Sequence, residues 1–137
     1  MLIDTNIILE IAFNQAKAGD CKKLLNAIDQ NAFEKDIYIT RFALNAIEAM
    51  SGKQKPEFLR EFLLFIFEEK IKIFDLKIED DLMINSIHSD LGLDFDDAVQ
   101  YVAANRLGTC LITFDKDLKD KGLIVKTPAE VLKEASA

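Results

Sequence analysis

Three acidic stretches of the sequence are suited to sharing a divalent metal ion. Asp4 ends the apolar run 1–3, Asp115 ends the run 110–114, and the acidic cluster 94–97 opens a helical segment before the second run. Neighbouring ionised carboxylates repel one another and raise one another's pKa, whereas Mg²⁺ or Mn²⁺ relieves this repulsion and takes oxygen ligands at about 2.1 Å. The pattern therefore indicates a carboxylate metal site, provided that the fold brings the three stretches together.

The elements around these acids predict an α/β fold. Short runs of Leu, Ile and Thr without polar alternation are typical of strands buried on both faces of a parallel sheet, and ligands bind beyond the carboxyl ends of such strands. Strands are expected at about 1–4, 36–40, 71–75, 109–113 and 123–126, and helices near 6–14, 20–34, 42–51, 55–69, 78–91, 95–107 and 128–135. This alternation predicts a three-layer α/β/α sandwich around a central parallel five-stranded sheet.

The order of the elements brings the C-terminal acids to one edge of that sheet. The helix 95–107 precedes the strand 109–113 and runs antiparallel to it, so Asp97 and Asp115 face the same rim. If the strand that ends at Asp4 lies beside the strand that ends at Asp115, where the strand order reverses, three carboxylates converge. Each acid also has a structural explanation: Asp4 as a helix cap, Asp97 at a helix N-terminus, and Asp115 with Asp117 as an Asx-turn.

Length and composition predict one domain over residues 1–137, soluble and cytoplasmic, with no membrane segment. No apolar stretch approaches the ~18 residues that cross a bilayer. The 24 acidic residues outnumber the 17 basic ones and give a formal charge of -7. This balance counts against a simple nucleic-acid binder, although bound cations can invert the local field and attract phosphates.

Three segments of the chain resemble the PIN-domain family of metal-dependent ribonucleases, which includes VapC-type toxins. They are the opening LIDTNIILE, the central NAIEAM and the segment LDFDDAVQYVAANRLGTCLITFDKDL. Each motif is weak alone, but four acidic positions in the family's order and spacing are fairly specific, and the resemblance covers essentially the whole chain. It implies that the catalytic and metal-binding residues are Asp4, Glu48, Asp97 and Asp115, supported by Asn6 and Thr113.

Two of these assignments have competitors. Glu48 sits about two turns into its helix, roughly 10 Å from the end nearest the rim, so it reaches the metal only if that helix leans across the sheet. An exposed glutamate is the alternative, although Leu44 and Ile47 place it at the border of the apolar face. Asp96 competes with Asp97, which is favoured because Ala98 follows it as in the family pattern.

The resemblance implies hydrolysis of RNA phosphodiester bonds with Mg²⁺ or Mn²⁺ as cofactor, by the toxin of a toxin–antitoxin pair. The expected partners are a single-stranded or structured RNA, an antitoxin protein and a second copy of the chain in a homodimer. The alternatives are a catalytically degenerate PIN-like binding or assembly module, an RNA-processing nuclease without antitoxin, and a phosphoryl-transfer domain. The Phe-rich helix 57–70 is expected either to be buried in the domain or to form a partner surface. Cations that could hold the RNA backbone are Arg41, Lys53, Lys55, Lys116 and Lys119.

Overall fold

The computed structural model describes residues 1–136, which form a five-stranded, fully parallel sheet with strand order β3-β2-β1-β4-β5. The strands are β1 (Leu2–Ile3), β2 (Tyr38–Thr40), β3 (Lys72–Phe74), β4 (Leu111–Ile112) and β5 (Val125–Lys126). The predicted parallel five-stranded sheet is therefore confirmed. The strands are shorter than predicted, because the apolar runs continue beyond the residues that pair with neighbouring strands.

Helices alternate with the strands as the sequence predicts. They are α1 (Thr5–Ala12), α2 (Ala18–Asp29), α3 (Arg41–Ser51), α4 (Pro56–Phe67), α5 (Ile78–Leu91), α6 (Phe95–Leu107) and α7 (Pro128–Ala135), with a 3₁₀ turn, η1, at Lys116–Leu118. The first two predicted helices were too long. Asn14 and Asn31 adopt φ values of 47° and 56° shortly after α1 and α2, a left-handed conformation that ends a helix.

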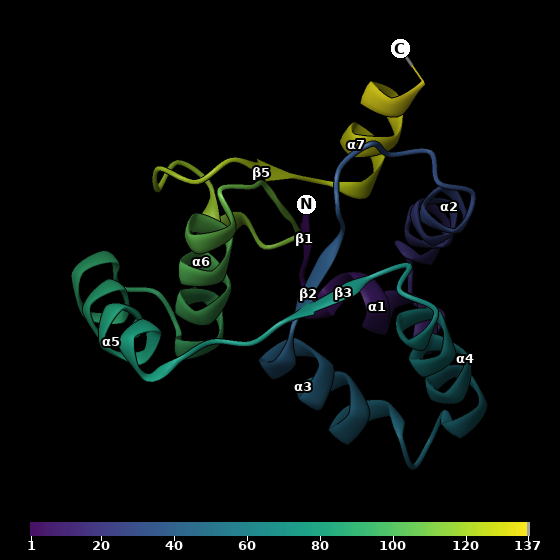
Figure 1. The fold of residues 1–137 in the computed structure, drawn as a ribbon, viewed down its shortest axis with the longest axis horizontal. Coiled ribbons are helices and arrows are strands. Elements are labelled where there is room, and N and C mark those ends of the chain that lie inside the picture. Colours follow the sequence, from purple (N-terminus) through teal and green to yellow (C-terminus); the bar gives the residue numbers. More distant parts are fainter. Residues whose placement is uncertain (137) are drawn as a thin grey trace.

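The helices cover both faces of the sheet, which confirms the three-layer α/β/α sandwich. Leu2 and Leu111 pack into one core with residues of α5 and α6. Ile3 and Ile112, the next residue on each strand, belong to a second core with residues of α1, α2, α3, α4 and α7. Figure 1 shows α5 and α6 to the left of the strands and α1, α2 and α4 to their right. The strands are apolar throughout because both of their faces are buried.

The strand order reverses at the pair β1 and β4. Leu2 lies opposite Leu111, and Ile3 opposite Ile112, while β2 and β3 continue on the other side of β1. The backbone N–H of Asp4 donates to the carbonyl of Ile112 at 3.0 Å. Asp4 therefore leaves the sheet beside the residues that follow β4, at the switch point where such folds bind ligands.

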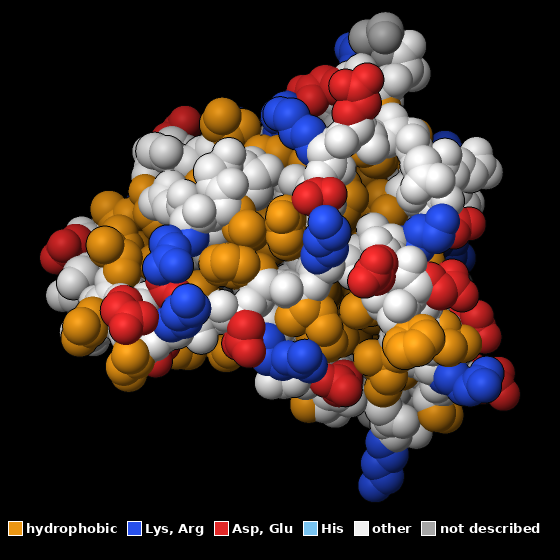
Figure 2. Space-filling model, viewed as in Figure 1, with side chains coloured by type: hydrophobic (Ala, Val, Ile, Leu, Met, Phe, Trp, Pro, Cys, Tyr) orange, Lys and Arg blue, Asp and Glu red, His pale blue; other side chains and the backbone are white. Residues whose placement is uncertain are grey.

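The Phe-rich helix α4 is buried on one side and exposed on the other. Phe62 and Ile66 are buried against the core, whereas Leu64 and Phe67 are 40% and 83% exposed. Hydrophobic side chains are visible over α4 at the lower right of Figure 2 and over α5 at its left margin. The expected burial in the domain holds for one face of the helix, and the partner surface stays a prediction for the exposed face.

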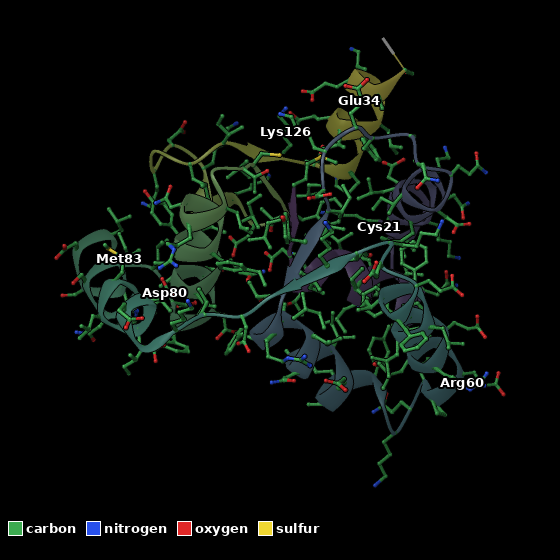
Figure 3. The ribbon with its side chains drawn as sticks, in the orientation of Figure 1. Cys21, Glu34, Arg60, Asp80, Met83 and Lys126 are labelled. Carbon is green, nitrogen blue, oxygen red and sulfur yellow. The ribbon has the colours of Figure 1, made fainter. Side chains whose placement is uncertain are left out.

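The contact between α5 and α6 contains a buried charge. The Asp80 carboxylate of α5, labelled in Figure 3, is 2% exposed and accepts a hydrogen bond from the Arg106 guanidinium of α6 at 2.5 Å. Its second oxygen accepts from the backbone N–H of Lys77 and so caps α5.

Among residues 1–136, no helix is both long enough and apolar enough to cross a bilayer.

Candidate active site

Asp4 is buried at the carboxyl end of β1, and three donors hold its carboxylate. Oδ1 accepts from the backbone N–H of Thr5 at 2.8 Å and from Gln100 Nε2 at 3.1 Å, and Oδ2 accepts from the Thr113 hydroxyl at 2.6 Å. Burial raises the pKa of Asp4 and the charge of Asp115 raises it further, while the three hydrogen bonds lower it. The net direction is upward. A cation beside Asp4 would oppose this rise by favouring the ionised form.

Thr113 connects Asp4 to two other predicted site residues. Its Oγ1 accepts from Asn6 Nδ2 at 3.1 Å and from the backbone N–H of Asp115 at 3.0 Å. The hydroxyl has one proton, which it donates to Asp4, so Asn6 must turn its amide N–H toward Thr113 and its Oδ1 away. That Oδ1 is buried and has no hydrogen-bond partner. It is an unpaired oxygen acceptor on a residue that the Thr113 hydroxyl links to Asp4.

Three carboxylates converge at the rim that follows β4. Single oxygens of Asp97, Asp115 and Asp117 lie within 4.8 Å of one another. Asp97 comes from the first turn of α6, and Asp115 caps η1 by accepting from the backbone N–H of Asp117 at 2.9 Å. The expected Asx-turn is therefore present, and its two acids also join the cluster. A set of oxygen ligands alone suits a hard cation such as Mg²⁺ or Mn²⁺.

The cluster is electrostatically strained without a cation. The pKa of Asp97 is raised to about 7, first by burial, then by the facing Asp115 carboxyl, and finally by the charges of Asp4 and Asp94. Because Asp4 and Asp97 interact through their charges, they belong to one acidic site. A divalent cation would offset the repulsion, so the residues present fit the metal that the resemblance implies.

The structure brings together five of the six predicted site residues. Asp4, Asn6 and Thr113 form one hydrogen-bonded group, and Asp97 and Asp115 lie beside it. The sixth, Glu48, is half-buried on α3, and among residues 1–136 it is not one of the carboxylates that meet within ligand distance of each other. Its role as a ligand stays a prediction.

Among residues 1–136, Asp97 joins the converging carboxylates, whereas Asp96 is exposed and lies outside that group. This supports the preference for Asp97, whose role as a ligand stays a prediction. Two other residues of the site were not anticipated. Asp117 joins the carboxylate group although the sequence indicated only a turn. Gln100 contacts Asp4 and could have been found, because it is a polar residue between buried neighbours one turn after Asp97.

A cavity of about 450 Å³ opens beside the cluster. It is lined by Gly92, Leu93, Asp94, Asp97, Lys116, Asp117, Lys119 and Lys121. Lys116 and Lys119 were expected near the site, Lys121 was not, and Arg41, Lys53 and Lys55 do not line this cavity. A larger cavity of about 760 Å³ lies at the opposite edge of the sheet, near Met1 and Cys110. The smaller cavity is the candidate active-site cavity, because Asp97 and Asp117 of the converging carboxylates line it.

Comparison with known proteins identifies relatives of the fold. A family model described as the PIN domain matches residues 1–123. A chain of a toxin–antitoxin complex from Klebsiella pneumoniae aligns with a TM-score of 0.68 at 20% identity, covering 93% of this chain and 96% of that one. A chain of VapBC2 from Rickettsia felis, bound to a DNA fragment from its promoter, aligns with a TM-score of 0.69 at 19% identity, covering 92% and 96%. Curated protein sequences gave no match.

Proposed function

The chain belongs to the PIN-domain family, whose members are generally nucleases, and from this premise we propose that it is a metal-dependent endoribonuclease. The observation that carries the proposal is the convergence of Asp97, Asp115 and Asp117 at the strand-order switch point, next to the buried Asp4 and the unpartnered Oδ1 of Asn6. Such a site attracts a divalent cation, and a cation in turn attracts a phosphodiester.

The predicted ligands of Mg²⁺ or Mn²⁺ are Asp4, Glu48, Asp97 and Asp115, and Asp117 joins them because its carboxylate converges with those of Asp97 and Asp115. Oδ1 of Asp4 already accepts two hydrogen bonds and Oδ2 accepts one, so Oδ2 keeps a free lone pair for a ligand bond. The unpartnered Asn6 Oδ1 would accept a hydrogen bond from a water molecule, whereas the Thr113 hydroxyl already makes three hydrogen bonds and would support the site by holding Asp4, Asn6 and Asp115. When bound, the cation supplies a Lewis acid that acidifies water and offsets negative charge on the phosphodiester.

The lysines beside the cluster would hold the RNA backbone. Lys116, Lys119 and Lys121 line the same cavity as Asp97, so a strand whose scissile phosphate lies at the carboxylates would have further phosphates within their reach. Phosphate contacts of this kind position a nucleic acid without reading its sequence. They also explain how a chain with a formal charge of -7 could engage a polyanion.

The decisive experiment compares the purified wild-type chain with Asp4→Asn and Asp97→Asn on single-stranded and structured RNAs. We expect cleavage with Mn²⁺ or Mg²⁺, none in EDTA, and loss of cleavage in both variants while their folded state is retained by circular dichroism. Asp96→Asn is the matched control, because Asp96 is exposed on the same helical turn and lies outside the cluster. Undiminished cleavage by Asp4→Asn and Asp97→Asn would refute the mechanism.

We propose further that the enzyme is the toxin of a toxin–antitoxin pair, acts in the cytoplasm and forms a homodimer. Two similar solved structures are toxin–antitoxin complexes, which supports an antitoxin partner. Induced expression of the wild type should arrest growth, Asp4→Asn should not, and co-expression of a small neighbouring reading frame should restore growth. Growth arrest that Asp4→Asn leaves unchanged would contradict the assignment as a toxin. Light scattering of the purified chain tests the homodimer, and the mass of a single chain would contradict it.

A catalytically degenerate binding module is the second candidate. It is favoured by the absence of Glu48 from the carboxylates that converge among residues 1–136, and by the exposed face of α4. Binding of Mn²⁺ in a calorimeter without cleavage of any RNA would support the module over the nuclease.

A further inference from the structure

A buried chain of hydrogen bonds leads away from Asp4 to a helix terminus. Gln100 Nε2 donates to Asp4 Oδ1, and Gln100 Oε1 accepts from the Thr40 hydroxyl at 2.9 Å. Thr40 Oγ1 in turn accepts from the backbone N–H of Ala43 at 2.9 Å and so caps α3. Gln100 and Thr40 are 3% and 0% exposed, so water does not compete for these bonds.

The orientation of the Gln100 amide follows from its neighbours. The Asp4 carboxylate, when ionised, only accepts hydrogen bonds, so the NH₂ group of Gln100 must face it. The carbonyl oxygen of Gln100 then faces Thr40, whose single hydroxyl proton is free to be donated because Oγ1 accepts from Ala43 through a lone pair. Each polar side-chain atom of this chain of hydrogen bonds has at least one hydrogen-bond partner in this arrangement. Reversing the amide would place its oxygen against the carboxylate, so the network has one favoured orientation.

The same hydrogen bonds determine which oxygen of Asp4 is free to bind a metal ion. The backbone N–H of Thr5 and the amide of Gln100 together occupy Oδ1, which leaves the free lone pair on Oδ2. Oδ2 is also the oxygen bonded to Thr113, the residue that contacts Asn6 and the backbone of Asp115. Without Gln100, the carboxylate would lose one of three restraints and could rotate.

We infer that Gln100 is a positioning residue that orients the Asp4 carboxylate toward the metal site and ties it to the N-terminus of α3. The inference rests on the proposed function and deepens it. Gln100 lies on α6 one turn after Asp97, Asp4 follows β1, and Thr40 joins β2 to α3, the helix that carries Glu48. One side chain therefore links three of the four segments that supply proposed ligands, in the way that outer residues hold metal ligands in place.

The test measures Mn²⁺ binding to the full-length chain by calorimetry, together with RNA cleavage. Gln100→Met keeps the size of the side chain and removes both hydrogen bonds. We expect Mn²⁺ affinity to fall about tenfold or more, and kcat to fall with it while KM for RNA changes little, because the lysines are untouched. Thr40→Val should also weaken Mn²⁺ binding. Thr40→Ser keeps the hydroxyl and should bind Mn²⁺ as the wild type does.

A combined variant and a control separate positioning from general stability. Thr40→Val and Gln100→Met together should cost no more Mn²⁺ affinity than Gln100→Met alone, because both cut one chain. Arg106→Met is the control, since it removes a different hydrogen bond, from the Arg106 guanidinium to the buried Asp80 carboxylate between α5 and α6, away from the proposed ligands. It should leave Mn²⁺ affinity unchanged, whatever its effect on urea unfolding.

Three results would count against the inference. Wild-type Mn²⁺ affinity in Gln100→Met overturns it and leaves the proposed nuclease standing. An equal loss of Mn²⁺ affinity in Arg106→Met overturns it as well, because the effect would then be one of stability. Absence of Mn²⁺ binding and cleavage in the wild type overturns the proposed function and the inference together. If Gln100→Met does not fold, Thr40→Val decides, because Thr40 does not touch Asp4 and its loss should still weaken binding.

Discussion

Replacing Asp97 by Asn should stabilise the metal-free protein at alkaline pH. The pKa of Asp97 is raised from its ordinary 3.8 to about 7 by burial and by its acidic neighbours. The folded state therefore binds more protons than the unfolded state between these two values, so this group's contribution to stability is present below pH 4 and is lost as pH rises to about 7. Asn carries no charge, so the stability of Asp97→Asn does not fall in this way as pH rises.

The size of the effect follows from the same rise. A rise from 3.8 to about 7 corresponds to about 4 kcal/mol if the carboxyl were fully shielded from solvent. Asp97 is partly exposed, and solvent screening reduces the figure to about 1–2 kcal/mol. In EDTA at pH 8, Asp97→Asn should therefore raise the free energy of unfolding by about 1–2 kcal/mol over the wild type. At pH 4 the two proteins should differ little.

Urea unfolding at pH 4, 6 and 8, followed by circular dichroism, measures this difference. Asp96→Asn is the control, because it removes a charge from the same first turn of α6 and has the same relation to the helix dipole. Saturating Mn²⁺ should reverse the order at pH 8, since it stabilises the wild type and not Asp97→Asn. Equal stability gains from Asp96→Asn and Asp97→Asn would refute the reasoning, because the repulsion would then not be localised at the cluster.

Three other predictions concern stability and substrate binding. Phe62→Ala should lower the free energy of unfolding by about 3–4 kcal/mol, and Phe67→Ala by less than about 0.5 kcal/mol because Phe67 is exposed. Urea unfolding measures both changes, and equal changes would contradict the assignment of Phe62 to the buried face of α4. Arg106→Met should cost about 1–3 kcal/mol because it leaves the buried Asp80 unpaired, and adding Asp80→Asn should recover part of that loss; no recovery would count against a charge effect. Lys119→Gln and Lys121→Gln should each make the slope of the logarithm of the RNA-binding constant against the logarithm of salt concentration shallower by about 0.7 for single-stranded RNA, whereas Lys53→Gln should leave it unchanged. Fluorescence anisotropy at increasing salt measures the slope. The same slope in all three variants would show that Lys119 and Lys121 do not contact the RNA.

The sequence by itself determined the architecture and the general address of the site. Unbroken apolar runs around Ile3 and Ile112 predict strands buried on both faces, and alternation with helices predicts a parallel sheet. Helix α6 must return antiparallel to β4, so its first turn and the end of β4 share one rim whatever the side chains do. For that reason the sequence places Asp97 and Asp115 at one edge, and it places Asp4 there on the condition that β1 lies beside β4, which the strand order confirms.

Tertiary structure decided the contacts within that site. The reach of Glu48 depends on the lean of α3 across the sheet, and the choice of Asp97 over Asp96 depends on the rotation of α6, neither of which a local pattern records. Asp117 and Gln100 joined the site through an Asx-turn and a buried amide bridge between segments 96 residues apart. Periodicity reports which face of an element is apolar, whereas side-chain contacts depend on how separate elements pack, and that is fixed only when the whole core is assembled.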